Sequence, residues 1–313
     1  MLSRVAESLY WIGRYVERAE DIARLININS SQVLDAPLTH RDQWMHLVEI
    51  TGNQSLFESL NKKRDERAVV RFMLNDRRHP GSMLSSLAAA RENARTIRDV
   101  LPQGGWEQLN ILTASVTTNI SDGLTKKKRF GFLQTTIRDC QTLSGIFDGT
   151  MSHDSAYHFL RIGVSIERAD MTSRIIDILS AEPDSDHEID STDTSVRWLS
   201  LLRTLSAYQM YRREVQAAVE RGPAMAFLLQ DRAFPRSVMH CLEKMDESLA
   251  ELPRSQVALK ASRQLRKFVA GMRAETLSQE ALHLFIDDLQ RELLALHELI
   301  SQTFFHFEME TPA

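Results

Sequence analysis

The sequence predicts an all-α fold: a duplicated helical bundle with long helices, pseudo-two-fold symmetry and no significant sheet. Apolar residues recur at helical spacing along nearly the whole chain. Glycine and proline, which the turns of an all-β fold require, number only 12 and 8 among the 313 residues. Two stretches of sequence also recur about 150 residues apart, which is typical of a duplicated fold.

The first expected helix covers residues 3–29. Its buried face consists of apolar residues three and four positions apart, namely Ile12, Tyr15, Val16, Ala19, Ile22, Ala23 and Ile26. The same spacing predicts further helices, in chain order, over residues 42–60, 66–75, 82–101, 105–121, 126–148, 155–180, 195–220, 223–230, 237–251, 254–273 and 277–305. Proline or glycine stands at most of the breaks and supports these boundaries.

The composition is that of a soluble globular protein, with 43% hydrophobic and 26% charged residues. The net charge of -4 offers no basic surface to nucleic acid, so we expect no such partner. Charged residues occupy the start of the chain, and no apolar run of about 18 residues follows, so we expect a cytoplasmic protein without membrane association. Cys140 and Cys241 have no metal-site spacing and are interpreted as reduced thiols.

The repeat is the most informative feature of the sequence. Residues 12–26 and 162–176 share seven identities in fifteen positions, and residues 72–87 and 227–242 share seven in sixteen. We therefore expect a tandem duplication, with one helical repeat over residues 1–150 and a second over residues 151–313. Each half begins with a very long helix whose apolar face needs additional partners, so we expect the halves to pack as one intertwined unit.

The second repeated segment is interpreted as a helix, a turn and a second helix. Its serines, Ser82 and Ser237, are each placed to cap the helix that follows.

A charged stripe is repeated along the first helix of each half. On a helical wheel, four positions share one side, and they hold Gly13, Glu17, Glu20 and Arg24 in the first copy and Gly163, Glu167, Asp170 and Arg174 in the second. At flanking positions the second copy has Val164 and Met171 in place of Arg14 and Asp21. A stripe that keeps its charges while its flanks become apolar is not typical of a solvent face. We therefore expect both stripes to be at least partly buried.

Arg18 and Arg168 lie at the edge of each stripe, where a guanidinium could reach a carboxylate on a neighbouring helix or a bound anion. Two interpretations follow: an ion-pair network that fixes the register of two long helices, or a cleft that binds a ligand. The candidate residues for either role are Arg14, Glu17, Arg18, Glu20, Arg24, Glu167, Arg168, Asp170 and Arg174.

Enzyme motifs are missing from the sequence. Glu280 and His283 form a single Glu-x-x-His pair without the second pair that a di-iron site needs, and phosphate-binding loops and nucleophile signatures are absent. We expect no metal and no cofactor, and we assign no catalytic residue. In the alternative hypothesis of an enzyme, Glu17 or Glu167 acts as general base while a nearby arginine holds an anionic group.

Four segments resemble the bacterial Alpha-E family. They are YWIGRYVERAE at residues 10–20, RIGVSIERAD at 161–170, RENAR at 91–95 and WEQLN at 106–110. The resemblance spans most of the chain, implies an all-α domain, and adds Glu92 and Arg95 to the candidate residues. Members of this family have no established activity, and are typically encoded beside, or fused to, a circularly permuted ATP-grasp peptide ligase and a transglutaminase-like protein.

The resemblance implies a component of a peptide-synthesis or peptide-modification system. Our first hypothesis is a non-catalytic helical subunit that binds the ATP-grasp ligase or its peptide substrate. The alternatives are an enzyme of the same pathway, which acts on an anionic substrate, and a scaffold or dimerisation module. A dimerisation module would make the chain a homo-oligomer.

Overall fold

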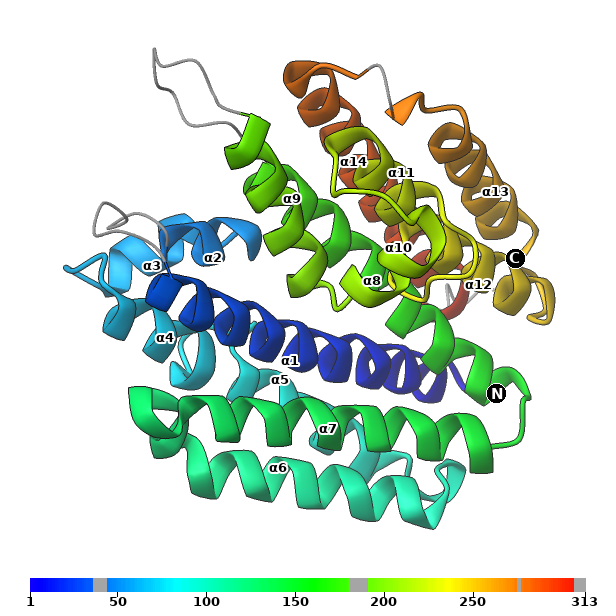
Figure 1. Cartoon of the computed structure of the whole chain (residues 1–313). Coiled ribbons are helices and arrows are strands. Elements are labelled where there is room, and N and C mark those ends of the chain that lie inside the picture. The colour runs from blue at the N-terminus through cyan, green and yellow to red at the C-terminus, as the bar shows by residue number, and fades with distance from the viewer. Residues whose placement is uncertain (36–43, 181–190, 275–276, 307–313) are drawn as a thin grey trace.

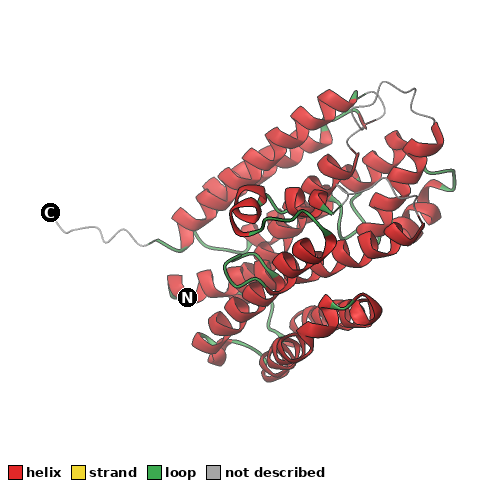
Figure 2. Ribbon diagram, turned by 90° about the vertical axis from the view of Figure 1, so that its left-hand side faces the viewer, coloured by secondary structure: helices red, strands yellow, loops and turns green. Residues whose placement is uncertain are grey.

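The computed structural model describes residues 1–35, 44–180, 191–274 and 277–306. Within these ranges the chain forms helices and connecting loops and no β-strand (Figures 1 and 2), which confirms the predicted all-α fold. Among the described helices, none combines the length and apolarity needed to cross a lipid bilayer.

The helices up to residue 150 form the lower part of the molecule in Figure 1. They are α1 (Ser3–Asp35), α2 (Met45–Ile50), α3 (Gln54–Leu60), α4 (Glu66–Asn75), α5 (Met83–Thr96), the 3-10 helix η1 (Arg98–Val100), α6 (Gln103–Leu124) and α7 (Lys126–Thr150). The helices that follow are α8 (Ser155–Ser180), α9 (Ser191–Thr204), α10 (Tyr208–Val215), α11 (Arg221–Gln230), α12 (Val238–Ala250), α13 (Gln256–Ala270) and α14 (Gln279–Phe304).

Two predicted helices are each divided in the structure. The helix expected over 42–60 is interrupted at Gly52, where a φ of 65° turns the chain between α2 and α3. The helix expected over 195–220 is interrupted at Ser206, whose φ is 53°, and α10 ends at Gln216, whose φ is 50°. Apolar spacing continues across both breaks because the residues on either side still face the core, so the pattern alone does not reveal them. Residues 42–43 lie outside the described part.

The predicted caps are confirmed. The Ser82 hydroxyl accepts a hydrogen bond from the Ser85 amide at the start of α5, and the Ser237 hydroxyl accepts one from the His240 amide at the start of α12. Such a bond satisfies one of the free amides of the first helical turn and stabilises the helix by about 1 kcal/mol.

Helices α1 and α8 organise the bundle. Among the described helices, α1 and α8 form the pair with the most extensive contact. Helix α1 also packs against α5 and α7. Helix α8 packs in turn against α12 and α14, so the partners of α8 follow the same order in the chain as the partners of α1. The buried apolar residues of both parts form one continuous core. The tandem duplication that the sequence suggests stays a prediction.

Candidate functional site

The backbones of α1 and α8 touch at two glycines. A Cβ atom on Gly163 would lie 2.0 Å from the carbonyl oxygen of Tyr10, and one on Gly13 would lie 2.4 Å from that of Leu160. Both distances are far below van der Waals contact, so only glycine allows the two helices to approach this closely. The charged stripes of the two helices consequently meet directly beside the crossing.

Two Glu-Arg pairs are exchanged across this crossing. Arg18 on α1 donates from Nε and Nη2 to the carboxylate of Glu167 on α8, over 2.5 and 3.0 Å. Arg168 on α8 donates from the same two atoms to the carboxylate of Glu17 on α1, over 2.8 and 2.7 Å. Both arginines thus reach a neighbouring helix and bind its carboxylate with two parallel hydrogen bonds, the strongest geometry for this pair.

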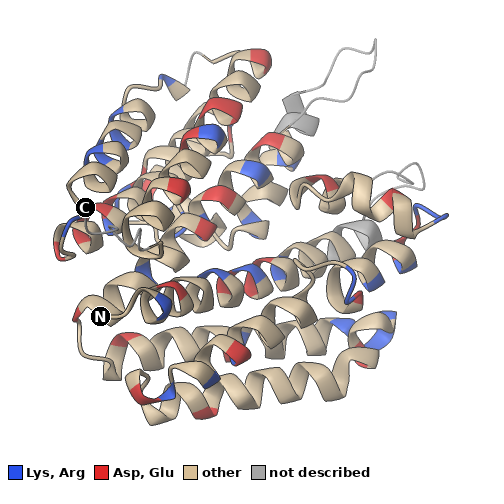
Figure 3. Ribbon diagram, turned by 180° about the vertical axis from the view of Figure 1, so that it is seen from behind, with Lys and Arg blue, Asp and Glu red and all other residues tan. Residues whose placement is uncertain are grey.

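A second arginine binds each of these two carboxylates. Arg14 donates to Glu167 over 2.7 Å, and Arg236, from the loop before α12, lies 2.8 Å from Glu17. Arg236 also contacts the carboxylates of Glu20, at 2.9 Å, and Asp21, at 2.7 Å. In this part of the molecule, acidic and basic positions lie side by side along the central helices (Figure 3).

The remaining charges of the stripes pair within one helix. Arg24 lies 2.5 Å from Glu20, and Arg174 lies 3.0 Å from Asp170, each four residues after its acid. Both pairs have the favourable order of an acid before a base. Every acidic residue of the two stripes is therefore bound to at least one guanidinium.

Burial makes these contacts energetically important. Glu17 and Glu167 are each only 2% exposed. Burial raises the pKa of Glu17, but the guanidinium groups of Arg168 and Arg236 outweigh it and lower the pKa to about 2. Burial likewise opposes ionisation of Glu167, and Arg18 and Arg14 lower its pKa below the ordinary value. Each carboxylate is bound by two arginines, so the geometry does not support a general base at either position.

Asp21 behaves differently from its neighbours. Its burial raises the pKa to about 7, and the negative charges of Glu17 and Glu20 act in the same direction. The guanidinium of Arg236 opposes this shift. One of its oxygens, Oδ2, is buried without a hydrogen-bond partner. Asp21 therefore takes up a proton more easily than Glu17 or Glu167, whose pKa values are lowered.

Sequence analysis missed Arg236, which lies at the centre of this network. At the offset of 155 residues that aligns the second pair of segments, Arg236 corresponds to Gly81. Asp21 corresponds to Met171 in the first pair, so the extra acid and the extra base occur together in one of the two sites. This joint departure from the repeat is the signal that could have identified Arg236.

Glu92 and Arg95 are not part of the network. They form a separate ion pair of 2.6 Å on α5, and both side chains are more than half exposed. Because solvent screens such pairs, this one contributes little to stability.

A family comparison fits the exchanged pairs. The model of the Alpha-E family, described as a predicted alpha-helical domain with a conserved ER motif, matches residues 1–305. The chain belongs to the Alpha-E family. The resemblance seen in the sequence is thereby confirmed. In this Alpha-E domain, the ER dipeptides 17–18 and 167–168 are the residues that exchange partners between α1 and α8.

Similar proteins are found in mycobacteria: the uncharacterised proteins Mb2597 of Mycobacterium bovis and MT2643 and Rv2567 of Mycobacterium tuberculosis. Each is 22% identical to this chain over 311 residues, an alignment that covers 94% of the chain and 34% of the relative. The chain therefore spans about a third of the length of these relatives. No solved structure matches it significantly.

A cavity of about 470 Å³ lies near the network of this Alpha-E domain, between α7, α8 and the start of α12. Its lining includes Arg168 but neither Glu17 nor Glu167. Cys241 also lines it, and burial raises the pKa of this thiol to about 12, which keeps it protonated and a poor nucleophile.

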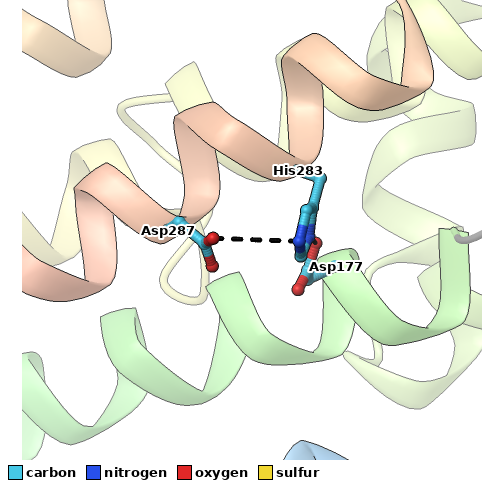
Figure 4. Close-up of side chains that lie close together, drawn as sticks. All are labelled: Asp177, His283 and Asp287. Atoms are coloured by element: carbon cyan, nitrogen blue, oxygen red, sulfur yellow. Dashed lines mark hydrogen bonds and ion pairs between the residues drawn. The ribbon is translucent and has the colours of Figure 1, made fainter.

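One group of described residues has the side chains that metal ions prefer. Asp177 on α8 and His283 and Asp287 on α14 place their ligand atoms within 4.8 Å of one another (Figure 4). Nδ1 of His283 donates to Asp177 over 2.8 Å, and Nε2 lies 3.8 Å from Asp287. The hydrogen bond with Asp177 raises the pKa of His283. Because both ring nitrogens face carboxylates, the arrangement suits a charged imidazolium that links α8 to α14.

Proposed function

We propose that this Alpha-E chain is a non-catalytic helical subunit that binds an ATP-grasp-type peptide ligase or the ligase's peptide substrate. The observation that carries the proposal is that the ER motif is buried and fully paired: Glu17 and Glu167 are each 2% exposed, and each is bound by two arginines. Such a motif positions helices. Binding of the partner is then left to the outer surfaces of those helices.

The length of the relatives also supports this proposal. In the mycobacterial proteins the matching region is about a third of the chain. A domain that occurs within a longer chain works beside other segments of that chain, which is consistent with a subunit that acts through a partner. The kind of partner, an ATP-grasp ligase with a transglutaminase-like protein, comes from the family resemblance in the sequence.

Co-expression with the ATP-grasp ligase encoded nearest to the chain tests the proposal. We expect the two proteins to co-purify, and we expect the purified chain to change the rate of ATP-dependent peptide ligation, measured as ADP release. The chain alone should show no turnover of peptide or ATP. If no complex forms and the ligation rate is unchanged, while the chain itself is folded by circular dichroism, the proposal is wrong.

The variant Glu17→Gln separates the roles of the motif and of the surface. Its carboxylate is buried, so we expect a lower melting temperature and unchanged ligase affinity below that temperature. An exposed acid provides the matched control, because Glu92→Gln should change neither quantity. Loss of affinity in a folded Glu17→Gln protein would instead place the partner on the ER motif itself.

A further inference from the structure

The wall of the cavity between α7, α8 and α12 can be compared with the aligned positions of α1. At the offset of 150 residues, Val164 and Ser165 of the cavity wall correspond to Arg14 and Tyr15. The smaller side chains of α8 leave volume that the larger side chains of α1 would fill. On this alignment, two residues that line the cavity are smaller than the residues at the same positions of α1.

The corresponding face of α1 is closed by aromatic side chains. The rings of Tyr10 and His297 are stacked with 5.6 Å between centroids, and the hydroxyl of Tyr10 lies 2.7 Å from Nδ1 of His297. Trp11 packs edge-on against His297, and the guanidinium of Arg14 lies 5.0 Å from the Trp11 ring. Where α1 carries Trp11, α8 carries Arg161, which lines the cavity.

Three cationic side chains face the cavity: Arg161 and Arg168 from α8 and Lys244 from α12. Arg168 is held in place by Glu17, and its remaining nitrogen, Nη1, makes only a long contact of 3.4 Å with the carbonyl oxygen of Pro235. A fixed guanidinium with donor capacity toward a cavity is a preorganised site for an anion, because no side-chain entropy is lost on binding.

The other two cations share one acid. Arg161 and Lys244 both contact the carboxylate of Glu247, at 2.6 and 3.0 Å, and Glu247 is 52% exposed. A half-exposed carboxylate exchanges readily for a ligand carboxylate or phosphate, because water solvates it when it is released. Asp148, the acidic residue of the lining, accepts a hydrogen bond from the hydroxyl of Tyr157 over 2.7 Å.

We infer that this cavity binds a small organic anion that carries carboxylate or phosphate groups. Arg161 and Arg168 are seven residues apart on one face of α8, about 10 Å along the helix, so the ligand is elongated. Its apolar part would lie against Phe147, Leu160 and Val164. A volume of about 470 Å³ is within the range of small-molecule sites. This inference is independent of the proposed function, since the site requires no protein partner.

Calorimetric titration of the full chain with sodium phosphate, sodium citrate and L-glutamate, each against sodium chloride of equal ionic strength, tests the inference. We expect saturable binding of at least one probe. Binding of phosphate alone identifies a phosphate ligand, and binding of citrate or glutamate identifies a carboxylate ligand.

Two variants assign the binding to the cavity. Ser165→Tyr introduces the residue that α1 carries and should abolish binding by filling the space. Lys244→Met keeps an unbranched side chain of similar length and removes its charge, so affinity should fall about tenfold without loss of folding. Gly131→Ala, on the exposed face of α7 with nothing near the added methyl group, is the control and should bind normally. The inference is overturned if no probe binds saturably, or if Lys244→Met binds as tightly as the parent.

Discussion

Replacing Gly163 by alanine challenges the closest contact of the structure. The new Cβ would lie 2.0 Å from the carbonyl oxygen of Tyr10, and real Cβ contacts are not found below 3.0 Å. Because the obstacle is backbone, α1 and α8 must separate by at least about 1 Å, and overpacking of this kind costs roughly 1–3 kcal/mol. The same displacement stretches the exchanged Glu-Arg bonds, which span 2.5–3.0 Å in the native state.

The expected net effect is a loss of about 3 kcal/mol in the free energy of unfolding. Weakened charge-assisted bonds in the buried network add to the overpacking, and the better helix propensity of alanine returns about 1 kcal/mol. The assay is urea unfolding followed by circular dichroism. Gly131→Ala, the same substitution in an open stretch of α7, should stabilise by about 0.5–1 kcal/mol. If Gly163→Ala is as stable as the parent, the helices do not touch as described.

Two other substitutions probe buried ionisable groups. Glu167→Gln should cost about 3–5 kcal/mol in urea unfolding because it strands two guanidinium groups, and a loss below about 1 kcal/mol, as expected for the exposed Glu92→Gln, would contradict the burial. Burial lowers the pKa of His79 to about 4 from 6.5, so between these values only the unfolded chain takes up the proton. The contribution of His79 to the free energy of unfolding is therefore complete above about pH 6.5. It declines toward pH 4, by at most about 1.4 kcal/mol per pH unit. His79→Phe should therefore lose less stability than the parent between pH 7 and pH 5, and equal losses would refute the assignment.

Sequence patterns were sufficient for the helices and for the charged stripes. Helical spacing identified the long helices because each has a continuous apolar face. The repeated glycines of the stripes, Gly13 and Gly163, lie where the two backbones touch. The breaks near Gly52 and Ser206 were not predicted, because residues with left-handed backbone angles can interrupt a helix without interrupting the apolar pattern.

Long-range partners lay beyond the reach of the sequence. The spacing of Glu17 and Glu20 on one helix face was predictable, but their shared partner Arg236 is more than 200 residues away and approaches from a loop. The cavity was also hidden, because the small size of Val164 and Ser165 becomes meaningful only when α7 and α12 are seen to surround them.

A double-mutant cycle on Arg18 and Glu167 tests the central claim, that buried charges exchanged between α1 and α8 hold the helices together. The free energies of unfolding of Arg18→Met, Glu167→Gln and the double variant are compared with that of the parent chain. We predict a coupling of at least about 1 kcal/mol, with the double variant more stable than the sum of the single losses implies. Losses that add within about 0.5 kcal/mol would contradict it, because residues that do not interact show no more coupling than that.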